Sequence, residues 1–268
     1  MAATIKKDKA KDLRTYLRKI KEARNGNGVL WFRGMSSISY NLVPTLFRNK
    51  KAAREGQQAF NALEQKINTL FRNKSIPYLE GKRALSGWEL LFLMQHYRAP
   101  TRLLDWSESP LVALHFATSK ALYSTSSPEE SAVVWAINPD NWNNSVMKPT
   151  GHQHGTVPVH DVVTEQYKPE IVYSNQEIPP LAVYGALNNP RISVQKGAFT
   201  VFGPTDKPLE DYANKLEKPG SLYKIEIPAE NVREVAEELV EAGITETSIY
   251  PDLEGLSAEI KRVMGFGE

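Results

Sequence analysis

The sequence predicts a single-domain α+β protein in which helices flank a mixed or antiparallel sheet. Segments with apolar residues at helical spacing occur between short runs of β-branched and aromatic residues. No repeat, low-complexity tract or linker divides the 268 residues. A chain of this length buries about three quarters of its unfolded surface, so one core can organise all of it.

The predicted helices cover residues 8–24, 52–73, 87–97, 110–123 and 229–242, with a last helix after Asp252. The predicted strands cover residues 29–32, 101–106, 132–137, 171–173, 191–194, 198–202, 222–227 and 244–249. Two helices have an apolar face that we expect to meet the core: Phe60, Leu63, Ile67 and Leu70 in the second, and Leu253, Leu256, Ile260 and Val263 in the last. Basic residues that flank the second helix, Arg48 among them, are expected to form a solvated face, and contact with a polyanion is the less favoured alternative.

The composition excludes several classes of site. The absence of cysteine excludes disulfides, thiolate metal ligands and a cysteine nucleophile. A net charge of +2 is too small for a general polyanion-binding surface. The N-terminus has no apolar leader, and no apolar run approaches the roughly 20 residues of a membrane span. We therefore expect a cytoplasmic protein without a membrane segment.

The common enzyme motifs are also missing. The sequence has no phosphate-binding loop, dinucleotide-binding glycine turn, nucleophile elbow or zinc-binding H-E-x-x-H helix. A loop carries His152, His154 and His160, but no acidic residue lies within it before Asp161. Without further ligands an exposed polar loop is the better interpretation, and no metal is predicted.

Arg33 and Gly34 follow the apolar run 29–32. An arginine at a strand end can bind an anion with two donors, and a neighbouring glycine lets the backbone approach it. The alternative is an arginine that pairs with a carboxylate inside the fold.

A second polar segment runs from Gln95 to Trp106. Within it, Asp105 lies in an apolar strand, where a buried carboxylate needs a partner. Arg33 and Arg102 are the candidates. Such a pair would hold two strands together, or form the centre of a polar pocket, and the two roles are compatible.

These segments resemble the FRG-domain family, which is named for its Phe-Arg-Gly motif. The resemblance rests on Trp31–Gly34, Gln95–Ser107 with Pro110–Ala117, Arg191–Phe199 and Tyr250–Gly255. The resemblance covers most of the chain from residue 29, so we expect an FRG-type domain over 29–268, preceded by an N-terminal helix in residues 1–28. Relatives more often have glycine after the tyrosine, where this chain has Arg98.

The order of the motifs also resembles that of mono-ADP-ribosyltransferases, more distantly. This resemblance implies a fold of that kind, NAD as cofactor, and catalytic roles for Arg33, Asp105 and Gln195. Arg33 would bind the pyrophosphate and Gln195 a ribose hydroxyl. The implied cofactor-binding residues are Arg33, Gly34, His96, Tyr97, Thr101, Arg102 and Ser107. Residue 197 is glycine where that family has its second acid, so Asp105, Glu170 or Glu177 would have to serve instead.

The resemblance therefore implies an ADP-ribosyltransferase-like enzyme that modifies a macromolecular acceptor: a protein, RNA or DNA. It points to a prokaryotic toxin or an anti-phage defence effector. One alternative is a non-catalytic module that binds a nucleotide or nucleic acid in the same pocket. Another is a protein that depends on a partner, such as an antitoxin, and this alternative predicts an exposed apolar patch.

Overall fold

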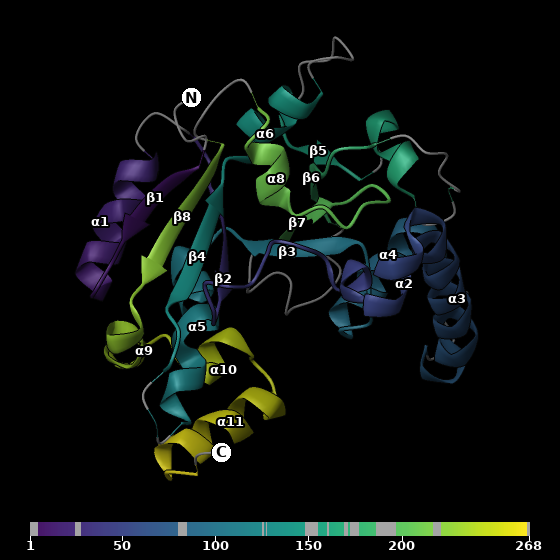
Figure 1. Ribbon diagram of the computed structural model, residues 1–268. Helices are drawn as coiled ribbons and strands as arrows, with labels where there is room; N and C mark the ends of the chain where they lie inside the picture. Colours follow the sequence, from purple (N-terminus) through teal and green to yellow (C-terminus); the bar gives the residue numbers. More distant parts are fainter. Residues whose placement is uncertain are drawn as a thin grey trace.

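The computed structural model describes residues 5–24, 28–79, 85–124, 126, 128–147, 155–159, 161–168, 171, 177–185, 197–216 and 221–266 (Figure 1). Within them, eight strands form one sheet in the order β1-β8-β4-β2-β3-β7-β6-β5. The strands are β1 (Lys6–Lys9), β2 (Trp31–Met35), β3 (Leu103–Ser107), β4 (Ala132–Ile137), β5 (Val157–Pro158), β6 (Leu181–Tyr184), β7 (Gly197–Val201) and β8 (Leu222–Ile227). The β1–β8 and β5–β6 pairs are parallel and the other pairs antiparallel. The predicted α+β class, with one mixed sheet and flanking helices, is confirmed.

The α-helices of the described part are α1 (Leu13–Arg24), α2 (Lys50–Glu55), α3 (Gln57–Ser75), α4 (Gly87–His96), α5 (Pro110–Thr118), α6 (Pro139–Val146), α8 (Leu209–Ala213), α9 (Val232–Glu241), α10 (Glu246–Ile249) and α11 (Leu253–Val263). Short 3-10 helices are η1 (Thr45–Arg48), η2 (Ile76–Tyr78), η3 (Ser119–Leu122), η5 (Val162–Tyr167) and η6 (Ala229–Asn231). No helix among the described residues is both long and apolar enough to span a membrane.

Strand β4 is buried on both faces. Its even-numbered residues pack in a cluster with side chains of α1, α5 and α9, and its odd-numbered residues join a second cluster that includes Leu46 and Trp142. Strand β2 pairs with β4 along its whole length, from Trp31 to Met35. Because side chains alternate along a strand, Phe32 and Gly34 lie on the face that α5 covers, and Arg33 lies on the other face.

The N-terminal helix is shorter than predicted. Residues Lys6–Lys9 form β1, which pairs with β8, and the helix begins only at Leu13. A strand of four charged residues gives no apolar pattern, but charged side chains suit the exposed edge of a sheet. Helix α1 buries Tyr16, Ile20 and Ala23.

The predicted helix 52–73 is two helices, and of its predicted apolar face Phe60, Leu63 and Ile67 pack on the core. Gly56, at φ 87°, ends α2 and begins α3. The buried residues of α3 are Phe60, Glu64 and Asn68, whereas Leu70 is 48% exposed. The buried face also carries Glu64, which forms the buried ion pair described below.

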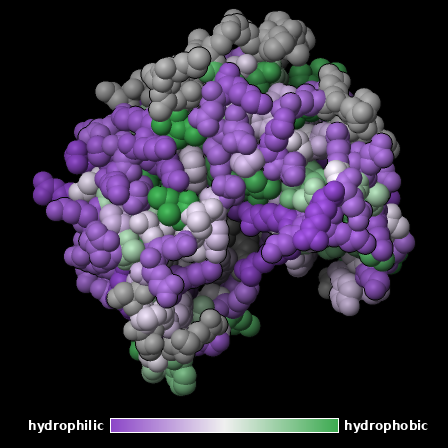
Figure 2. Space-filling model, viewed as in Figure 1, coloured by the Kyte–Doolittle hydropathy of each residue, from purple (hydrophilic) through white to green (hydrophobic). Residues whose placement is uncertain are grey.

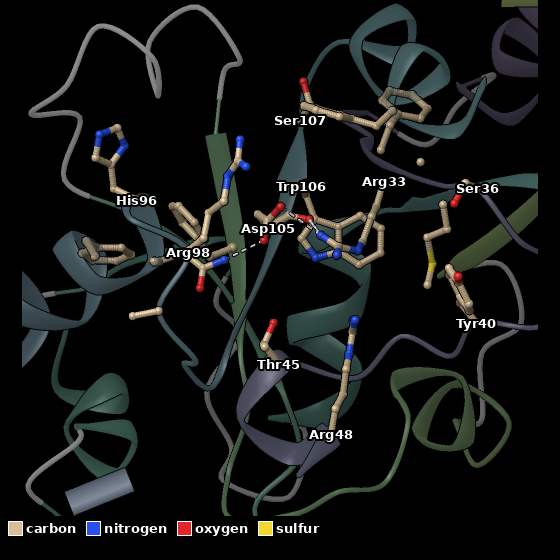
Figure 3. Close-up of a pocket in the computed structure, with 18 of the residues that line it drawn as sticks. Arg33, Ser36, Tyr40, Thr45, Arg48, His96, Arg98, Asp105, Trp106 and Ser107 are labelled. Atoms are coloured by element: carbon tan, nitrogen blue, oxygen red, sulfur yellow. Dashed lines mark hydrogen bonds and ion pairs between the residues drawn. The ribbon is translucent and has the colours of Figure 1, made fainter. Parts of the chain in front are cut away.

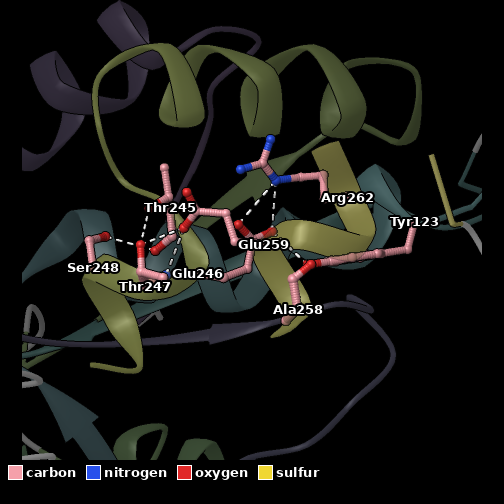
Figure 4. A network of polar contacts seen from close by, with 8 residues as sticks. All are labelled: Tyr123, Thr245, Glu246, Thr247, Ser248, Ala258, Glu259 and Arg262. Carbon is pink, nitrogen blue, oxygen red and sulfur yellow. Dashed lines mark hydrogen bonds and ion pairs between the residues drawn. The ribbon is translucent and has the colours of Figure 1, made fainter. Parts of the chain in front are cut away.

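The predicted strand 244–249 is wrong, because this segment contains α10. Glu246 at its start is buried and accepts hydrogen bonds from Arg262 Nε (2.9 and 3.0 Å) and from the Tyr123 hydroxyl (2.6 Å) (Figure 4). This tertiary contact outweighs the β propensity of the local sequence.

Helix α11 is also oriented differently from the prediction. The four apolar residues expected in the core, Leu253, Leu256, Ile260 and Val263, are between 45% and 82% exposed. The helix packs instead through Gly255, which is buried against Tyr250, and through Arg262. In Figure 2, apolar side chains are visible at the lower tip of the molecule, where α11 lies.

We expect the Glu246–Arg262 contact to make stability depend on pH. Burial raises the pKa of the Glu246 carboxyl, but the hydrogen bonds from Arg262 and Tyr123 outweigh burial and hold the pKa below its ordinary value. Because the pKa of Glu246 is lower in the folded state, its ionised carboxylate stabilises the fold at pH values above its unfolded pKa of about 4.3. This stabilisation is lost as the pH falls through the folded pKa. Melting temperatures of the wild type and of Glu246→Gln, measured from pH 7 to 3, should therefore converge at the acid end. Parallel curves would contradict the assignment.

Candidate functional site

A cavity of about 550 Å³ opens beside β2 and β3. Its polar lining includes Arg33, Arg48, Gln95, His96, Arg98 and Asp105, and its aromatic lining includes Phe92, Trp106, Phe116, Phe199 and Tyr250. Strands β2 and β3 share a single residue pair, Phe32 with Ser107, whereas β3 and β7 share five pairs. The cavity lies where the pairing of β2 and β3 ends. In the view of Figure 2, the surface of the molecule is hollowed near its middle.

One chain of hydrogen bonds connects the two predicted polar segments (Figure 3). The Thr101 hydroxyl donates to Gln95 Oε1, and Gln95 Nε2 donates to Asp105 Oδ1 at 2.6 Å. On the other side of the carboxylate, Arg33 Nη1 lies 3.0 Å from Asp105 Oδ2 and donates to the Asp105 carbonyl oxygen at 2.7 Å. The polar residues at 95, 101 and 105 thus hold the Phe-Arg-Gly arginine in place.

The predicted Arg33–Asp105 contact is confirmed, but the predicted burial of Asp105 is wrong. Its side chain is 56% exposed, and that of Arg33 is 18% exposed. The carboxylate borders the cavity while its neighbours Leu104 and Trp106 are buried. Asp105 is therefore accessible to a ligand.

Arg102 has a different partner from the one predicted. It is 1% exposed, and its Nε donates to Glu64 Oε1 at 2.7 Å, while Nη2 contacts the second carboxylate oxygen. Glu64 is 3% exposed, and neither residue lines the cavity. The pair joins α3 to the segment that precedes β3. The sequence signal was the i, i+4 spacing of Phe60 and Glu64, which placed a carboxylate on the buried face of α3.

Gly34 has a packing role. A Cβ atom at this position would lie 1.8 Å from Ala113 O and 2.7 Å from Ala117 N, both backbone atoms of α5. The residue also borders the cavity. The expected close approach is thus between β2 and helix α5, which only glycine permits.

The other predicted site residues divide into three groups. His96 and Ser107 line the cavity. Tyr97 is 67% exposed and Thr101 is buried, and neither lines it. Gln195 and the predicted strand 191–194 lie outside the described residues.

Neither Glu170 nor Glu177, the acids proposed as alternatives to Asp105, is among the residues that line this cavity in the described part of the chain. Glu177 lies 3.0 Å from Lys207 Nζ and borders a second, smaller cavity instead. Glu170 lies outside the described residues, as do His152, His154 and His160. Among the residues that are described, no group of three histidines or acids is placed to hold a metal ion.

Arg48 is a cavity residue that the sequence did not indicate. It is exposed, as expected of the basic residues beside the second helix, but it also ends η1 and lines the cavity. Its Nε and Nη2 donate to the carbonyl oxygen of Val43 at 2.9 and 2.7 Å. Burial and the nearby charge of Arg33 lower the pKa of Arg48, and Asp105 opposes this shift.

Arg98 has an unusual backbone conformation at the edge of the cavity. It adopts φ 58°, in the left-handed region that favours glycine, which is the residue that the family resemblance leads us to expect here. Its guanidinium Nη2 lies 3.9 Å from Glu254, and both side chains are well exposed.

Arg33 lies in the middle of β2 and not, as the sequence had predicted, at the end of a strand. Fold and site together define an α+β protein in which this arginine and a facing carboxylate border one cavity. Residues 28–126 match the family model of the FRG domain. The match includes Arg33, Arg48, Gln95 and Asp105. Comparisons with curated proteins and with solved structures gave no match.

Proposed function

We propose that this protein is an NAD-dependent ADP-ribosyltransferase that modifies a macromolecular acceptor, either a protein or a nucleic acid. The setting would be a prokaryotic toxin or an anti-phage defence effector. The observation that carries the proposal is the hydrogen-bond chain from Thr101 through Gln95 and Asp105 to Arg33, at the edge of a cavity. It places a fixed guanidinium and an accessible carboxylate side by side, as transfer from a pyrophosphate-bearing donor requires.

The chemistry assigns a role to each group. Cations and aromatic rings line the same cavity, which suits a ligand with phosphates and planar rings. In the reaction the bond between the ribose anomeric carbon and nicotinamide breaks, and nicotinamide leaves with the electron pair. The acceptor nucleophile then bonds to that carbon and loses a proton.

Positive charge builds at the anomeric carbon during this step. A carboxylate stabilises it better than a neutral amide does. Of the three acids considered, Asp105 borders the cavity, and it is the acid we assign to this role. Gln195 would bind a ribose hydroxyl, as the resemblance implies.

The proposal predicts that Asp105→Asn lowers kcat for nicotinamide release by roughly 10²–10³, the usual cost of one preorganised electrostatic contact. Stability should change little, because a pair that includes a mostly exposed carboxylate contributes at most about 1 kcal/mol. Release of labelled nicotinamide and the melting temperature are measured in parallel. The control is Asp211→Asn, which removes an exposed carboxylate on α8.

Arg33→Ala should also abolish turnover in a folded protein. If the wild type releases no nicotinamide yet binds NAD, the non-catalytic nucleotide-binding module becomes the better description. Wild-type turnover by Asp105→Asn would instead remove Asp105 from the catalytic role.

A second candidate is a protein that depends on a partner, such as an antitoxin. The exposed apolar face of α11 supports it, since an exposed patch of this kind is typical of a contact surface. The two candidates are compatible, because α11 and the cavity are on neighbouring parts of the chain: Tyr250, just before α11, lines the cavity.

A further inference from the structure

The position of Arg48 is fixed by the fold. Leu46 and Phe47, beside it in η1, are buried, and Leu46 N donates to Thr101 O at 3.1 Å. This bond connects η1 to the segment that leads into β3. The double contact to Val43 O then orients the guanidinium itself. Arg48 is therefore held at the edge of the cavity by backbone contacts.

The charge of Arg48 has no paired carboxylate among the residues that the structure describes. No ion pair of Arg48 occurs within the described part of the chain, whereas Arg33 is paired with Asp105. Figure 3 shows Arg48 extending from η1 toward the Arg33–Asp105 pair. The lowered pKa of Arg48 is consistent with two cations that lie close together in a partly buried site. An anion that binds between them would relieve this repulsion.

We propose that Arg48 is the principal anion-binding residue of the cavity and that, together with Arg33, it binds the two adjacent phosphates of a diphosphate ligand. The inference rests on the proposed function for the identity of the cavity as the ligand site. Arg33 must share its donors with Asp105, so an incoming phosphate competes with that carboxylate. Within the described residues no carboxylate pairs with Arg48, whose Nε and Nη2 donate to the neutral carbonyl of Val43.

A diphosphate fits this arrangement better than a single phosphate. The two guanidinium groups come from different elements, η1 and β2, and both residues line the cavity. Each can bind one phosphate with charge-assisted hydrogen bonds. The ligand class is therefore a dinucleotide or a nucleoside diphosphate.

Binding of inorganic pyrophosphate, orthophosphate and ADP-ribose, measured by calorimetry without divalent cations, tests the inference. Arg48→Gln should weaken pyrophosphate and ADP-ribose on the order of tenfold or more, which corresponds to one lost charged hydrogen-bond partner. The matched control is Arg54→Gln, an exposed arginine on α2 that does not line the cavity, and it should bind as the wild type does. Orthophosphate should bind the wild type much more weakly than pyrophosphate.

A second measurement on the wild type avoids any effect of substitution on folding. Pyrophosphate should protect Arg48 from modification by phenylglyoxal, as read by mass spectrometry, and should leave Arg54 reactive. Unprotected Arg48, or a folded Arg48→Gln that binds pyrophosphate normally, would overturn the inference. Equal affinity for orthophosphate and pyrophosphate would overturn its diphosphate part.

Nicotinamide release from NAD, measured in the same samples, separates this inference from the proposed function. If the wild type binds pyrophosphate through Arg48 but does not turn over NAD, the anion site is supported and the transferase function is contradicted. If the wild type turns over NAD but Arg48→Gln does not weaken pyrophosphate binding, the transferase function is supported and the role of Arg48 is contradicted.

Discussion

Arg102→Met should lower the free energy of unfolding by about 3–5 kcal/mol, the typical cost of breaking a buried ion pair by removing one partner. Arg102 and Glu64 are 1% and 3% exposed. After the substitution the Glu64 carboxylate would stay buried without its cation, among apolar neighbours such as Phe60. Denaturant unfolding of the purified variant measures the loss.

The double variant Arg102→Met/Glu64→Leu is the control for this result. Replacing both members of a buried ion pair with apolar residues of similar volume is often neutral or stabilising. We therefore expect the double variant to recover most of the stability that the single variant loses. A double variant as unstable as Arg102→Met would mean that the pair contributes through packing and not through charge.

Gly34→Ala should destabilise the protein by roughly 3 kcal/mol or more, at or above the upper end of the usual cost of overpacking. The added Cβ would lie 1.8 Å from Ala113 O, and a backbone atom cannot move aside as a flexible side chain can. Helix α5 would have to move away from β2. Thermal unfolding measures the effect.

The companion variant Ala113→Gly would not relieve this clash, because the atom in the way is a carbonyl oxygen. Should Gly34→Ala fold with normal stability, the contact between β2 and α5 must be looser than described. Loss of activity without loss of stability would instead point to the approach of Gly34 to a ligand, the role first expected of it.

The elements that were predicted well are those whose type and bounds follow from the pattern of their own residues. Strands β4 and β8 were predicted at their observed bounds. Strand β4 is a wholly buried apolar run, and β8 has buried apolar residues around the half-buried Lys224 and Glu226 and ends before a proline. Asp252 caps α11 as expected, through a 2.9 Å bond from Gly255 N. The contact of Arg33 with Asp105 followed from a carboxylate in an apolar strand.

The wrong predictions depend on contacts between distant residues. Strand β1 has no apolar pattern and forms because β8 offers an edge. Helix α10 depends on Arg262, 16 residues after Glu246. Arg102 pairs with Glu64 because of how α3 packs. Arg48 lines the cavity because of how η1 packs. Local patterns do not determine that packing.

The strand order also sets the limits of any useful fragment. The stretch that matches the family, residues 28–126, contains β2 and β3 but neither of their outer neighbours. Strand β4 begins at Ala132 and β7 at Gly197. In a recombinant fragment that ends at residue 126, β2 and β3 would be joined by one residue pair only, and the outer edge of each strand would be exposed. Exposed strand edges favour aggregation. In this chain, expression boundaries should extend at least through Ile227, where β8 ends.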